Sequence, residues 1–170
     1  TEEEFRNVAS AYRASIDANP LSLQFSAYVA PSDNVNNGSE EGVLRLEGID
    51  LTFILPEDRR SLSGVAFSAS SEARYRILEG LKSATYLTGS LAGETYVLSS
   101  EAKDLLASSP NPVVRAVEGS DFETVTAALG FNHQQNNIST FGPVRFGMNF
   151  GTYWEGGERL VDFRDLSLEQ

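Results

Sequence analysis

The chain contains no cysteine. This absence excludes disulfide bonds, thiolate metal sites, iron–sulfur clusters and cysteine nucleophiles. Basic residues are also scarce, because 13 Lys and Arg stand against 24 Asp and Glu, for a formal net charge of −11. Such a surface repels the phosphate backbone of DNA or RNA, so the charge argues against a nucleic-acid partner.

Several signatures of catalysis and of membrane insertion are missing as well. No apolar run approaches the roughly 18 residues of a membrane-spanning helix, so no transmembrane segment is expected. The sequence has no glycine-rich phosphate loop and no Gly-x-Ser-x-Gly nucleophile elbow. The single histidine, His133, lies in an amide-rich stretch that we interpret as an exposed loop. These absences favour a protein without enzymatic activity.

What the chain does have is an ordinary globular composition. Apolar residues make up 41% and aromatic residues 10% of its 170 residues, enough for a hydrophobic core. The length favours one globular domain spanning residues 1–170.

The most regular pattern lies between Phe141 and Leu168. From Val144 to Trp154, apolar residues occupy alternate positions, which is typical of a half-buried strand. A Glu-Gly-Gly-Glu turn at Glu155–Glu158 and a second run at Leu160–Leu168 follow. The pattern predicts a long β-hairpin, and we expect it to form the centre of a sheet.

Other segments also indicate strands. Leu21–Val29 alternates cleanly, and Val43–Leu55 and Leu62–Ala69 each change phase at a glycine, which predicts bulged and curved strands. Tyr86–Leu98 predicts a hairpin, and Val113–Val117 a short strand.

Helical spacing predicts an amphipathic helix over residues 2–17, with its apolar stripe at Phe5, Val8, Ala9, Tyr12 and Ile16. Further helices are predicted at 71–84, at 100–107 and at 121–129, the last from a Ser120-x-x-Glu123 capping box. The fold class is therefore α+β: a mainly antiparallel, curved β-sheet or a jelly-roll-like β-sandwich, with an N-terminal helix and two or three short packed helices. We expect the N-terminal helix and the helix at 121–129 to pack against the sheet.

One loop matches part of the pattern of a calcium-binding loop. From Asp33, the pair Asn37-Gly38 takes the fifth and sixth positions of a calcium loop, but Val35 and Leu44 stand where ligands are required. A looser oxygen site for Ca²⁺ remains as an alternative to a solvated turn; its ligands would be Asp33, Asn36, Glu40 and Glu41. No other cofactor is expected.

The C-terminal hairpin supplies the candidate binding residues. Carboxylates beside aromatic rings suit sugar binding, since a ring stacks on the sugar and acids bond its hydroxyls. The candidates are Tyr153, Trp154, Asn149, Glu155 and Asp162. With Glu158 and Asp165, the acids are also numerous enough for the carboxyl pair of a glycoside hydrolase.

The closing segment Val161–Glu169, Val-Asp-Phe-Arg-Asp-Leu-Ser-Leu-Glu, resembles the last strand of many jelly-roll carbohydrate-binding modules. The resemblance covers only this segment, and the helices predicted at 2–17, 71–84 and 121–129 depart from those modules. It implies a glycan-binding β-sandwich as one alternative.

Taken together, the sequence favours a non-enzymatic structural or interaction protein that contacts other protein subunits in a homo- or hetero-oligomer. A virion or an extracellular, cell-surface assembly is favoured over the cytoplasm. The alternatives are a carbohydrate-binding module and an acid-pair glycoside hydrolase.

Overall fold

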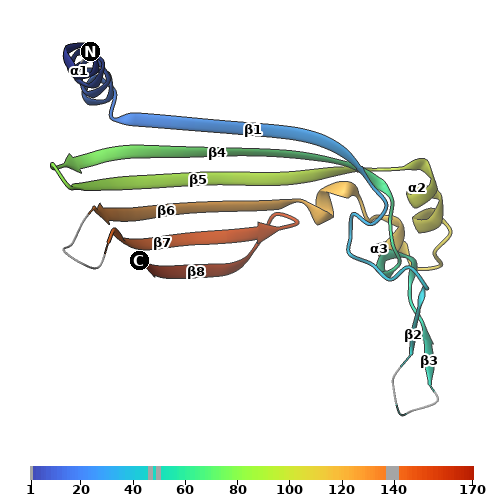
Figure 1. The fold of residues 1–170 in the computed structure, drawn as a ribbon. Coiled ribbons are helices and arrows are strands. Elements are labelled where there is room, and N and C mark those ends of the chain that lie inside the picture. Colours follow the sequence, from blue (N-terminus) through green and yellow to red (C-terminus); the bar gives the residue numbers. More distant parts are fainter. Residues whose placement is uncertain (1, 46–47, 49–50, 137–141) are drawn as a thin grey trace.

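A computed structural model describes residues 2–45, 48, 51–136 and 142–170. Its main feature is a six-stranded antiparallel sheet in the order β1-β4-β5-β6-β7-β8 (Figure 1). The strands are β1 (Leu21–Ser32), β4 (Gly64–Glu79), β5 (Ser83–Leu98), β6 (Thr124–Gln135), β7 (Val144–Glu155) and β8 (Glu158–Glu169). The expected mainly antiparallel sheet with a few short helices is confirmed. The sheet does not close on itself, because β1 and β8 are its two edges.

The helices and a small second sheet lie beyond the ends of the strands. Helix α1 (Glu2–Ala18) precedes β1, and α2 (Ser100–Ala107), α3 (Pro112–Arg115) and the 3₁₀ turn η2 (Gly119–Phe122) separate β5 from β6. Between β1 and β4 the chain forms the two-stranded hairpin β2 (Val43–Arg45) and β3 (Thr52–Ile54), then the 3₁₀ turn η1 (Glu57–Arg59). The hairpin projects away from the body of the sheet (Figure 1).

A compact hydrophobic core exists at one end of the sheet, beside α2 and α3. It joins Leu62, Leu98, Leu106 and Val114, each at most 5% exposed, to Val35 and Ala102. Ser99 caps α2 by accepting a hydrogen bond from the Ala102 amide, and this fixes the helix against the end of β5. The helix predicted at 100–107 is confirmed.

The helices predicted at 71–84 and 121–129 are wrong, because both segments belong to long strands. Residues 71–79 continue β4, and 124–129 begin β6. In each segment apolar or small residues also fall at alternate positions, and pairing with neighbours on both sides outweighs weak local helix propensity. A capping box does occur, but it uses Glu118 and Asp121 and caps only η2.

Four smaller predictions also need correction. Tyr86–Leu98 belongs to a single strand, and Val113–Val117 overlaps helix α3. His133 lies within β6, and the chain remains extended to Gln135. The strand predicted over Val43–Leu55 is the β2–β3 hairpin, with Gly48 at a φ of 85° between its arms. Positions 46–47, 49–50 and 137–140 of these predictions lie outside the described residues.

The hairpin predicted between Phe141 and Leu168 is confirmed as β7 and β8; Phe141 itself lies outside the described residues. Its turn places Gly156 and Gly157 at φ values of 55° and 80°, as a tight two-residue turn requires. The predicted central position is wrong, since β8 is an edge strand and the middle of the sheet is β5 and β6.

Helix α1 does not cover the sheet, contrary to expectation. It lies beyond the start of β1 (Figure 1), and Phe5, Val8 and Tyr12 remain at least 66% exposed. The side chains of Ala9 and Ile16 are outside the described set. Among the residues that the structure describes, no helix therefore forms a layer over either face of the sheet.

Candidate interaction surface

Strand register gathers the apolar side chains on one side of the sheet. Because successive side chains in a strand point to opposite faces, cross-strand partners share a face. We call one side the apolar face; it comprises the odd-numbered residues of 21–29, 65–75, 85–97 and 125–133, the even-numbered residues of 146–154 and 162–168, and Arg159, which lies opposite Trp154. The opposite side, the polar face, is rich in Ser, Thr, Gly and amide residues.

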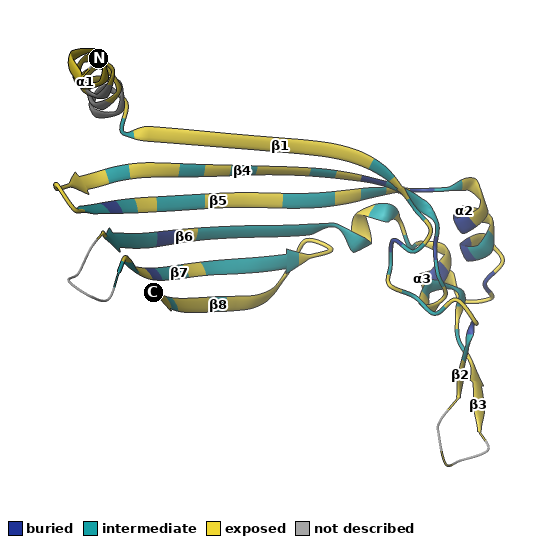
Figure 2. Ribbon diagram, viewed as in Figure 1, coloured by how far each residue is buried: buried dark blue, intermediate teal, exposed yellow. Residues whose placement is uncertain are grey.

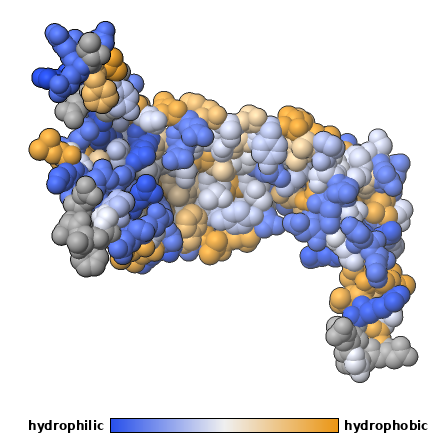
Figure 3. All heavy atoms as spheres, in the orientation of Figure 1, coloured by the Kyte–Doolittle hydropathy of each residue, from blue (hydrophilic) through white to orange (hydrophobic). Residues whose placement is uncertain are grey.

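The apolar face is exposed to solvent. Phe25 is 72% exposed, Val29 64%, Leu129 72% and Leu166 70%. Figure 2 shows strands that are exposed or half-buried along most of their length, with the buried residues concentrated at the α2–α3 end. In the view of Figure 3, hydrophilic and intermediate residues (blue and white) cover the middle of the sheet, and hydrophobic residues (orange) lie along both of its margins. An apolar surface of this extent is typical of an interaction site.

The apolar face is also corrugated. The cross-strand row Ala27, Ala69 and Gly93 consists of small residues, and it floors a hollow of about 1080 Å³ bordered by Phe25 and Leu91. A second hollow of about 690 Å³ lies over Ala73, Gly89 and Ala127. Leu91 borders both hollows, and its cross-strand neighbours Ser71 and Ala127 are small. Large side chains such as Leu91 therefore stand between hollows that are floored by small residues.

Charge is nearly absent from this face. Over its described strands the only charged residues lie on β8, where Asp162 pairs with Arg159 and Arg164 follows. The surplus of acidic residues is therefore carried by the remaining surfaces.

The polar face contains a hydrogen-bonded cluster around the half-buried Glu94 that sequence patterns did not reveal. Glu94 accepts hydrogen bonds from Ser68 Oγ (2.5 Å), Tyr96 Oη (2.5 Å) and Tyr28 Oη (3.2 Å). The Ser68 hydroxyl, followed by the two tyrosines, lowers the pKa of Glu94. Burial, aided by the Glu94 charge, raises the pKa of Tyr96 to about 12. The cluster ties β1, β4 and β5 together by cross-strand contacts.

The candidate residues of the C-terminal hairpin divide between the two faces. Tyr153 and Asn149 lie on the polar face, whereas Trp154 and Asp162 lie on the apolar face, and Glu155 stands at the turn. Asn149 donates to Asp165 at 3.4 Å. Tyr153 and Trp154 therefore cannot stack on the same sugar ring.

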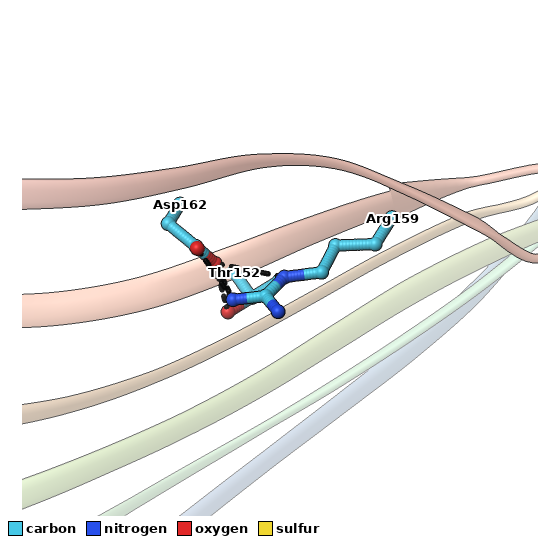
Figure 4. Close-up of polar contacts among 3 residues, drawn as sticks. All are labelled: Thr152, Arg159 and Asp162. Atoms are coloured by element: carbon cyan, nitrogen blue, oxygen red, sulfur yellow. Dashed lines mark hydrogen bonds and ion pairs between the residues drawn. The ribbon is translucent and has the colours of Figure 1, made fainter.

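Asp162 makes the best-defined polar contacts of the hairpin (Figure 4). Thr152 Oγ1 donates to Asp162 Oδ1 at 2.8 Å, and the Arg159 guanidinium donates to both carboxylate oxygens. These contacts, Arg159 first, lower the pKa of Asp162, and the same pairing raises the pKa of Arg159. A general acid needs the opposite shift, and Asp165 lies on the other face, so these acids do not form a facing pair.

In the loop considered for calcium, the side chain of Asn36 makes hydrogen bonds to the backbone. The Asn36 amide nitrogen donates to the carbonyls of Asp58 (2.9 Å) and Arg60 (2.7 Å), and its oxygen accepts from the Leu62 amide at 3.0 Å. Asn36 thus joins the loop after β1 to the segment before β4, at the edge of the core. Across the described ranges, no three His, Asp or Glu side chains are grouped so as to hold a metal ion.

The single histidine, His133, contacts a side chain of the neighbouring strand. His133 Nδ1 lies 2.9 Å from Thr85 Oγ1 of the neighbouring strand, and Thr85 is buried. Sequence interpretation placed His133 in an exposed loop because the amide-rich residues around it resemble loop composition. The alternation of Phe131 and His133 with the polar Asn132 was the signal available for a strand.

The fold and the surface together define a class: an open, antiparallel, amphipathic sheet with one uncovered apolar face. No helix in the described part of the chain combines the length and hydrophobicity needed to cross a bilayer. No family model, no curated protein and no solved structure matches the chain.

Proposed function

We propose that this protein is a non-enzymatic structural subunit whose apolar face docks against protein. The observation that carries the proposal is the exposure of that face, from Phe25 on β1 to Leu166 on β8. An isolated sheet with one apolar face gains stability when a second layer of structure removes that face from water. The β-sandwich expected from the sequence would then be completed by another subunit.

The shape of the face supports a protein partner. Pits floored by Ala69 and Gly93 beside projecting residues such as Leu91 suit interdigitating side chains, which pack at the density of protein interiors. Glycan binding at the hairpin has weaker support, because its two aromatic candidates face opposite sides.

The chemistry of the described acids also supports a structural role. Asp162 is held ionised by Arg159, and the Glu94 carboxylate is occupied by three hydroxyl donors. Both arrangements tie strands or turns together, and neither leaves a proton donor poised over a substrate.

The test combines multi-angle light scattering with binding of a hydrophobic fluorescent dye. A docking protein is expected either to assemble or to remain monomeric with a face that binds the dye strongly. A monomer that binds no dye would contradict the proposal, since the apolar face would then be covered within the chain itself. The Leu129→Glu variant should lower dye binding or assembly, because Leu129 projects from that face.

A further inference from the structure

We infer that the partner of the apolar face is a second copy of this chain, packed face to face as a two-fold symmetric dimer. The inference rests on the proposed docking function and adds the identity of the occupant. Three observations carry it: the excess exposed area, the self-complementary relief and the local charge.

The exposed area is far larger than a monomer of this mass should have. A monomeric protein of 18.5 kDa exposes about 8,200 Å², whereas this chain exposes 12361 Å². If each copy buried half of that excess, the dimer would bury about 4,000 Å² in total, within the range of obligate homodimers. Helix α1 and the projecting β2–β3 hairpin also contribute to the excess, and for this reason only half of it is assigned to the apolar face.

The relief of the face suits self-packing. Two-fold symmetry places the same surface on both sides, so each surface must carry both projections and pits. This face does, because Leu91 projects between one hollow over Ala69 and Gly93 and another over Ala127. Two such sheets would pack about 10 Å apart with strands inclined at about 30°.

Local charge removes the main objection, which is repulsion between two chains of net charge −11. The charges of the apolar face are confined to Arg159, Asp162 and Arg164 on one edge strand, and acids do not predominate among them. When two copies pack through their apolar faces, the remaining acidic residues stay on the outer sides of the dimer.

The first experiment compares neighbouring positions on opposite faces of β5. Leu91→Glu places a charge in the middle of the apolar face, whereas Ala92→Glu places the same charge on the polar face. Sedimentation velocity should show a dimer for the original chain, a dimer Kd raised about 100-fold or more for Leu91→Glu, and little change for Ala92→Glu. Equal effects of the two variants would overturn the inference.

The second experiment does not depend on the stability of a charged variant. Because the chain lacks cysteine, a single introduced thiol can crosslink only to another copy. With a short bis-maleimide, Leu91→Cys should form covalent dimers much faster than Ala92→Cys. Faster crosslinking through Ala92→Cys would contradict face-to-face packing.

The outcomes separate this inference from the proposed function. A monomer at all concentrations that still binds the hydrophobic dye overturns the second copy as occupant and leaves docking of a different protein. A monomer that binds no dye overturns both. A monomer that floats with phosphatidylcholine vesicles assigns the face to lipid and overturns both as well.

Discussion

At the scale of single residues, stability depends on few buried side chains. Leu62 is fully buried at the α2–α3 end, where its amide donates to Asn36 and its carbonyl accepts from Val35. Leu81, at the β4–β5 turn, is fully exposed. Replacing either leucine by alanine removes the same atoms, from a buried site at Leu62 and from an exposed site at Leu81.

We expect Leu62→Ala to lower the free energy of unfolding by about 2–5 kcal/mol, since it removes buried methyl groups and leaves a cavity. Leu81→Ala should change it by less than about 0.5 kcal/mol. Urea unfolding at one fixed protein concentration measures both. Similar losses for the two variants would show that the small core does not anchor the fold.

Glu94 gives the fold a predictable response to acid. Its pKa in the folded protein lies below the ordinary value of 4.5, so its stabilising contribution is complete above that pH and is lost as the pH falls further. Glu94→Gln should be less stable than the original chain at pH 7, and the gap should narrow below pH 4.5. Urea midpoints measured from pH 7 to pH 3 test this, with Glu158→Gln, in the exposed β7–β8 turn, as the control. A gap that is constant with pH would contradict an ionised role for Glu94.

At the scale of elements, the β7–β8 hairpin is held by a side chain packed over a glycine. Phe163 lies opposite Gly151 in the register, and its ring occupies the space that a Cβ on Gly151 would need. An aromatic ring over a cross-strand glycine replaces the contacts that the glycine lacks.

Gly151→Ala should therefore lower the free energy of unfolding by about 1–3 kcal/mol through overpacking. Adding Phe163→Ala should recover part of the loss, but not all, because the Ala127 carbonyl oxygen lies 2.8 Å from the added carbon. Chemical denaturation of the two single variants and the double variant measures the coupling. Strictly additive losses would show that the ring is not the obstacle.

The elements also show why some of the fold was predictable. Strands with uninterrupted alternation, such as β1 and β7, were recognised from sequence, and so were the Gly156-Gly157 turn and helix α2. Residues 71–79 and 124–129 were misassigned because their small residues fit both a helical and an alternating pattern. Only the partners on either side, β1, β5 and β7, select the extended form, and pairing over such distances leaves no local signal.

The interaction surface was hidden by the same errors. With 71–84 and 121–129 treated as helices, the small residues Ala73 and Ala127 could not be placed on a common face with Phe25 and Leu91. The Glu94 cluster likewise joins residues from three strands, and the register is needed to see it. The hairpin residues were found because they are close in sequence, but proximity in sequence did not place them on one face.

At the scale of the whole molecule, the uneven distribution of charge should make the proposed self-association dependent on salt. Each chain carries a net charge of −11, while the apolar face carries charge only on β8. In the proposed dimer, two copies would repel one another through their outer surfaces and attract one another through the apolar faces that they bury. Screening weakens the repulsion, because the Debye length falls to about 10 Å at 0.1 M salt.

We expect the dimer Kd to fall at least about threefold as NaCl is raised from 20 to 200 mM, since only the repulsive contribution is screened over that range. Sedimentation velocity across the series measures it, and Leu91→Glu, if the apolar face is the interface, should remain largely monomeric throughout. A dimer that weakens with added salt would mean that ion pairs between copies drive association. The copies would then meet through their charged surfaces, and the apolar face would need a different partner.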